Sequence, residues 1–107
     1  MVRPDDIELH DAVVERLEVD YPARAARIAV SYYASHDARQ RSRAVIRFEQ
    51  VESVSHHADL LAMVNNASAG NVNYWNPAVR AKRTFIYLVE GCLAVEAELV
   101  FFEPLNG

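Results

Sequence analysis

The chain has 107 residues, of which 51% are hydrophobic and 24% are charged, and its formal net charge is −4. This composition predicts one globular domain, residues 1–107, and argues against a disordered segment, a nucleic-acid-binding protein or a membrane span. Met1–Asp11 lacks the apolar centre of a signal peptide, and the single Cys92 cannot form an internal disulfide. We therefore expect a cytoplasmic protein with no membrane or nucleic-acid partner.

The first two predicted elements are strands that form a hairpin. Over Val13–Asp20 apolar and charged residues alternate, which is typical of a strand with one buried face, and the Tyr21-Pro22 step ends it. A second apolar face follows after a short connection and predicts an antiparallel partner strand. Its members are Ile28, Val30, Tyr32 and Ala34.

A third strand is predicted where Ala44, Ile46 and Phe48 alternate with basic residues. We call the basic set the arginine stripe; its members are Arg39, Arg41, Arg43 and Arg47. From Arg3 to Asp20 the chain has seven acidic residues and two arginines, whereas from Arg24 to Arg47 it has six arginines and one aspartate. The stripe can therefore be a solvated face that pairs with the acidic first strand, or a docking patch for an acidic protein partner.

A short helix is predicted near residues 58–65, with Asp59 near its start and four apolar side chains on one side. A further strand, Val72–Trp75, precedes the break at Pro77. Tyr74 and Trp75 combine large rigid rings with polar tips, a feature of binding hot spots and also of ordinary cores. Trp75 is thus either a structural plug or a partner contact.

The C-terminal hairpin, residues 83–103, is the strongest pattern in the chain. Its first strand is apolar on both faces, and Glu90-Gly91 marks a tight turn. In the second strand the expected core face is Leu93, Val95, Ala97, Leu99 and Phe101, opposite Glu96 and Glu98. Because Phe101 and Phe102 are adjacent, both faces are apolar there. This predicts a second sheet layer or a homodimer contact through these two rings.

No spacing in the sequence specifies a catalytic site, and no cofactor is expected. Cys92 has no cationic neighbour that would lower its pKa, and the serines lack the glycine-flanked turn of a hydrolase nucleophile. His10, His56 and His57 are suitable metal ligands, but they form a site only if the fold brings them together. A metal-dependent enzyme using these residues therefore remains the alternative hypothesis.

Together these elements predict an α+β domain that is mainly β, with antiparallel sheet(s) of about 5–6 strands, one short helix and a C-terminal hairpin. Several segments resemble small bacterial domains of unknown function, and some similar families are immunity proteins of bacterial toxin systems. The segments are Leu9–Val13, Arg47–Val51, Asn71–Trp75, and Ile86–Gly91 with Val95 and Ala97. The resemblance implies a compact β-rich fold and a non-catalytic, partner-binding role. We accordingly expect a protein-interaction domain that forms a homo-oligomer; the alternative is a small-ligand-binding protein or the metal-dependent enzyme.

Overall fold

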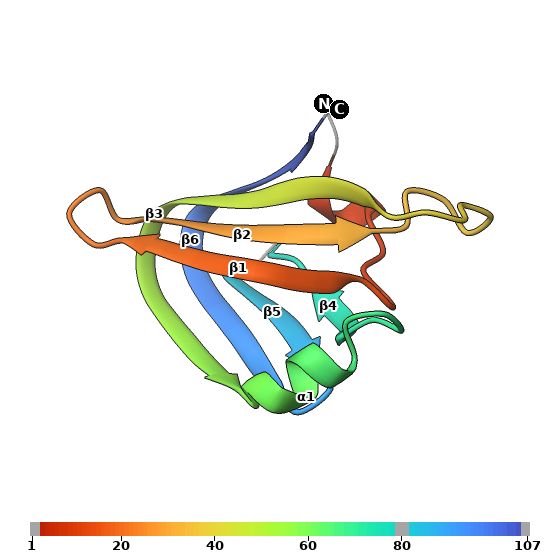
Figure 1. Ribbon diagram of the computed structural model, residues 1–107. Coiled ribbons are helices and arrows are strands. Elements are labelled where there is room, and N and C mark those ends of the chain that lie inside the picture. The colour runs from red at the N-terminus through yellow and green to blue at the C-terminus, as the bar shows by residue number, and fades with distance from the viewer. Residues whose placement is uncertain (1–2, 79–81, 106–107) are drawn as a thin grey trace.

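The computed structural model describes residues 3–78 and 82–105, which form one six-stranded antiparallel sheet (Figure 1). The strand order is β1-β2-β3-β6-β5-β4. This confirms the predicted fold class, including the short helix and the C-terminal hairpin. Among the described residues no helix is long and apolar enough to cross a membrane. The elements are η1 (Pro4–Asp6), β1 (Val13–Asp20), β2 (Ala25–Tyr32), β3 (Ser42–Ala58), α1 (Leu60–Asn65), β4 (Val72–Asn76), β5 (Arg83–Leu88) and β6 (Gly91–Pro104).

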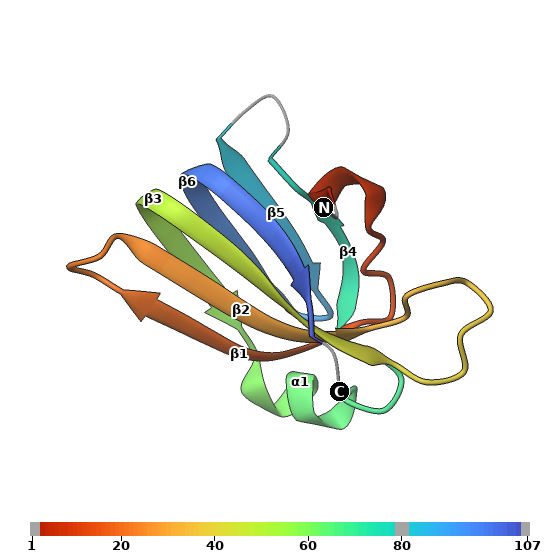
Figure 2. The same ribbon diagram turned by 90° about the horizontal axis from the view of Figure 1, so that it is seen from above.

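The sheet bends over itself because its two longest strands, β3 and β6, run through both halves. Figure 1 shows β1, β2 and the first part of β3 above, while the rest of β3 curves with β6 and β5 toward α1. Seen from above, the strands spread from β1 on one side to β4 on the other (Figure 2). The bend in β3 coincides with Gln50, whose φ is 54°, and with a register shift between Val51 and Ser53. Such a bulge sharpens strand curvature and changes which residues face inward.

The structure differs from the prediction for the end of β6. Leu93, Val95 and Ala97 are buried as predicted, but farther along the strand Phe102 is only 3% exposed, and Leu99 is exposed. Phe102 lies in the core, with its ring centroid 5.0 Å from that of Tyr32, whereas Phe101 is half-buried on the outer face. The expected core positions of Leu99 and Phe101 are wrong, because the inward face of β6 changes from odd to even positions between Ala97 and Val100, beside the positive-φ residue Gln50 of β3.

Intramolecular contacts cover both phenylalanines that suggested a second layer or a homodimer. Phe102 packs against Tyr32 of β2 and Trp75 of β4 in the core, and the guanidinium carbon of Arg47 lies 4.3 Å from the ring centroid of Phe101. The second layer is therefore the same sheet. The homodimer stays a prediction, but these rings no longer require it.

The two edges of the sheet differ. Residues 7–12 lie along β4: Trp75 Nε1 donates to the Ile7 carbonyl at 2.8 Å, and the Asp11 amide donates to the Val72 carbonyl at 3.1 Å. The amides of Asn71 and Val72 in turn donate to the Ala12 carbonyl. Residues 7–12 thus cover the β4 edge. Natural proteins often cover a sheet edge in this way, which prevents it from pairing with another chain. At the opposite edge, β2 is the one strand among the described residues that pairs with β1.

Candidate functional site

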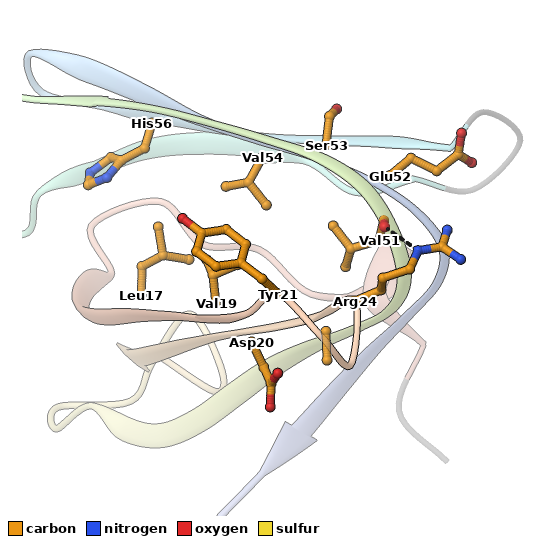
Figure 3. Close-up of a pocket in the computed structure, with 11 residues that line it drawn as sticks. Leu17, Val19, Asp20, Tyr21, Arg24, Val51, Glu52, Ser53, Val54 and His56 are labelled. Atoms are coloured by element: carbon orange, nitrogen blue, oxygen red, sulfur yellow. Dashed lines mark hydrogen bonds between the residues drawn. The ribbon is translucent and has the colours of Figure 1, made fainter.

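An open groove runs along the inner side of the edge strand β1. Two cavities of about 690 Å³ and 390 Å³ share Leu17 and His56 as lining residues, and together they extend from Val13 to Tyr21. Figure 3 shows the larger cavity, with β1 on one side and the second part of β3 on the other. We call the combined depression the β1 groove.

Apolar side chains from three elements form the walls of the β1 groove. A bulge between Val14 and Arg16 shifts the alternation of β1, so that Val14, Leu17 and Val19 pack toward the core. Val54 and Ala58 line the opposite wall from β3. Figure 3 shows the Tyr21 ring extending from the β1–β2 turn toward the groove. The walls therefore offer mainly dispersion and hydrophobic contacts to a ligand.

Helix α1 forms one rim of the β1 groove. Asp59 caps the helix by accepting a hydrogen bond from the Ala62 amide at 3.0 Å, and this bond, followed by one with Glu90, lowers the Asp59 pKa. Of the four apolar side chains expected on one side of the helix, Met63 is the one packed against the core. Leu60, Leu61 and Val64 remain 71%, 71% and 72% exposed.

The end of the groove near Tyr21 is polar. Asp20 accepts a hydrogen bond from the Ala23 amide, and Arg24 Nε donates to the Val51 carbonyl at 3.1 Å (Figure 3). Glu52 pairs with Lys82 at 3.0 Å, and the Lys82 pKa is raised, first by Glu98 and then by Glu52. Because these polar groups already bond to partners within the chain, they hold this end of the groove in place and are not free to act on a ligand.

The arginine stripe does not form one continuous patch. Arg39 and Arg41 lie in the loop before β3, and Arg41 donates to the carbonyls of Asp11 and Ser68 at 3.1 and 2.9 Å. Arg43 is exposed on β3, and Arg47 pairs with Glu103 and Glu49 while covering Phe101. Arg41 thus ties loops together, and Arg47 pairs with acids of β3 and β6 rather than of β1.

Tyr74 and Trp75 lie on opposite faces of β4. Trp75 is 7% exposed, and its ring packs 6.3 Å from Phe102, as the structural-plug interpretation requires. Tyr74 is exposed on the outer face and stacks on Tyr87 with a centroid distance of 4.5 Å. Tyr87 in turn stacks on Phe85 at 5.9 Å. Of the two residues, Tyr74 alone is available to a partner at this surface.

The fold places His10 apart from His56 and His57, the other two candidate metal ligands. His10 lines a cavity beside the loop after β2, where its Nδ1 is 2.8 Å from the Asn73 carbonyl. His56 lines the β1 groove opposite Leu17, and His57 follows it on β3, where neighbouring side chains point to opposite faces. In the described residues no three His, Cys, Asp or Glu side chains form a group that could hold a metal ion.

The pKa values of two other groups shift in ways that bear on reactivity. Hydrogen bonding to the Asn73 carbonyl, followed by the charge of Asp11, raises the His10 pKa above 6.5. Burial raises the pKa of the Cys92 thiol, so this cysteine is protonated at neutral pH and is a weak nucleophile.

No protein-family model, curated protein or solved structure matches this chain. The fold and the β1 groove themselves define a small, strongly bent antiparallel β domain with one covered edge and one open edge. One feature of the sequence could have indicated this apolar surface: three large apolar residues, Leu60, Leu61 and Val64, lie in a helix of six residues. Such a helix is too short to bury three large side chains by itself.

Proposed function

We propose that the chain is a non-catalytic protein-interaction domain of the cytoplasm and that the β1 groove, with the exposed side of α1, is its binding surface. The observation that carries this proposal is the exposure of Leu60, Leu61 and Val64 beside an apolar groove. Burying each such side chain stabilises a complex by roughly 1.5–3 kcal/mol. Contiguous exposed apolar surface of this kind is typical of interaction sites.

The resemblance to small bacterial domains, some of them similar to immunity proteins, supports the same general role. The internal contacts of Arg41 and Arg47 favour the groove over the arginine stripe as the principal contact. Neither arginine can engage an acidic partner fully without giving up an existing hydrogen bond or ion pair.

The experiment that tests this proposal compares Leu60→Ser/Leu61→Ser with Leu99→Ser, a matched control on the outer face of β6. Each protein is used for affinity capture from its native cells, and captured proteins are quantified by mass spectrometry. We expect a defined protein set to be lost with the double variant and kept with the control. An unchanged set, with both variants folded by circular dichroism, would refute the groove as the binding surface.

A second candidate function, binding of a small apolar molecule, is favoured by the volume of the larger cavity. Its size of about 690 Å³ falls within the range typical of small-molecule sites. Native mass spectrometry of protein purified from its own cells would show a bound species of constant mass. That species should be lost from Val54→Trp, which fills the cavity.

A further inference from the structure

We propose that the partner binds as an extended basic strand that pairs with the free edge of β1 and inserts alternate apolar side chains into the β1 groove. This inference rests on the proposed function and adds the mode of binding and the chemistry of the partner. Addition of a strand to an open edge is a recurrent mode of peptide recognition, in which backbone hydrogen bonds give affinity and side-chain pockets give specificity.

The open edge is the first feature that supports strand addition. Over residues 3–78 and 82–105, β2 is the one strand beside β1, whereas residues 7–12 cover β4. Within the described ranges, Val14 is the one β1 residue whose backbone bonds an element other than β2: its amide donates to Asn71 Oδ1 at 2.8 Å. The stretch from Arg16 to Asp20 therefore offers unpaired backbone groups to an incoming strand.

The direction of the groove is the second feature. The two cavities that form it follow β1 from Val13 to Tyr21 and meet at Leu17. A strand added to β1 would lie about 4.8 Å away, parallel to this depression. Every second side chain of that strand would then point into the groove beside Leu17 and Val19 and toward the exposed leucines of α1. A globular partner that contacts α1 alone would leave the length of the groove unfilled.

The charges of β1 indicate which kind of strand would be added to it. β1 carries Glu15, Glu18 and Asp20 against Arg16. Arg16 pairs with Glu18 at 2.9 Å, so among the described residues Glu15 and Asp20 are the acids of β1 that have no ion pair. An added strand with lysine or arginine at its outward positions would place opposite charges across the new pair. A second copy of β1 would instead bring together two strands that each carry an excess of acid. The occupant is therefore a basic peptide segment of another protein.

The test uses a synthetic peptide in which lysine alternates with valine and isoleucine, together with a form in which glutamate replaces lysine. Two further forms carry N-methyl groups either on the lysines or on the apolar residues. Because amide groups of a strand point alternately to its two edges, one methylation pattern blocks the hydrogen bonds to β1 and the other leaves them intact. Binding is measured by fluorescence anisotropy, and contact with β1 by NMR shifts of the Arg16–Asp20 amides.

We expect the lysine peptide to bind at least about tenfold more tightly than the glutamate form, and one methylated form to lose at least about tenfold relative to the other. Failure of the lysine peptide to bind, or equal binding of both methylated forms, would overturn the inference. These results leave the protein-interaction proposal standing if Leu60→Ser/Leu61→Ser still abolishes capture of cellular proteins. The peptide experiment can therefore fail while the capture experiment succeeds: equal affinities of the two methylated peptides refute strand addition alone, whereas unchanged capture by Leu60→Ser/Leu61→Ser refutes the binding surface.

Discussion

Arg24 and Val51 exchange two hydrogen bonds at the bend of β3. The Val51 amide donates to the Arg24 carbonyl at 2.9 Å, and Arg24 Nε donates to the Val51 carbonyl at 3.1 Å (Figure 3). Arg24 has a φ of 53°, and Gln50, next to Val51, has a φ of 54°. The pair joins the β1–β2 turn to the bulge and so fixes the polar end of the β1 groove.

Arg24→Ala removes the side-chain bond and leaves the backbone bond in place. We expect the free energy of unfolding to fall by about 1 kcal/mol, the usual net value of one hydrogen bond. Urea denaturation followed by circular dichroism measures this change. Arg43→Ala, at an exposed position of β3, is the control and should change stability by less than about 0.5 kcal/mol. Equal losses in the two variants would contradict the role of Arg24.

Phe102→Ala and Phe101→Ala test which of the two adjacent rings at the end of β6 faces the core. Phe102 is buried between Tyr32 and Trp75, so its truncation should cost about 3–5 kcal/mol, whereas truncation of the half-buried Phe101 should cost about 1 kcal/mol. Chemical denaturation gives both values. A larger loss for Phe101 would agree with the alternation predicted from the sequence and contradict the change of inward face between Ala97 and Val100.

Glu103→Gln tests the ion pair with Arg47. Hydrogen bonding to Arg47 lowers the Glu103 pKa below 4.5, so the carboxylate stabilises the fold above this value and loses that effect as the pH falls through the lower folded-state pKa. The variant should therefore show a smaller loss of melting temperature on acidification than the natural protein. Glu8→Gln, at an exposed position, is the control and should retain the full loss.

Asp11→Asn should lower the pKa of His10. In the natural protein the Asn73 carbonyl and the charge of Asp11 hold this pKa above 6.5, so protonated His10 stabilises the fold below 6.5 and the effect is lost as the pH rises through the raised pKa. Asparagine also tolerates the positive φ of 63° at position 11. NMR titration of the imidazole protons measures the shift, and an unchanged pKa would remove Asp11 as a cause.

Much of the fold could be predicted from periodicity. The alternation over Val13–Asp20 placed β1 correctly, because a strand with one buried face has a two-residue repeat. The extension of β3 to Ala58 was missed, since two irregularities and a polar outer face hide the repeat after Phe48. The position of Phe102 was mispredicted because β6 changes its inward face where it crosses the bend at Gln50 of β3, and a bend that depends on a distant strand leaves no mark in the alternation of β6 itself.

The candidate site was less accessible to sequence reasoning. The β1 groove exists because β1 is at the edge of the sheet, and strand order cannot be derived from the alternation within each strand. The contacts of Arg41 were equally hidden, since its acceptors are backbone carbonyls of Asp11 and Ser68, which any residue could supply. The histidines were correctly treated as dependent on the fold, which places His10 away from the groove that His56 lines.

The contact between Trp75 and Ile7 joins residues 68 positions apart in the chain. Residues 7–12 can therefore dock only after β4 has been synthesised, and closing so long a loop slows this step of folding. Until then both edges of the sheet are open, so the nascent protein is exposed to aggregation through the edge that the mature protein covers.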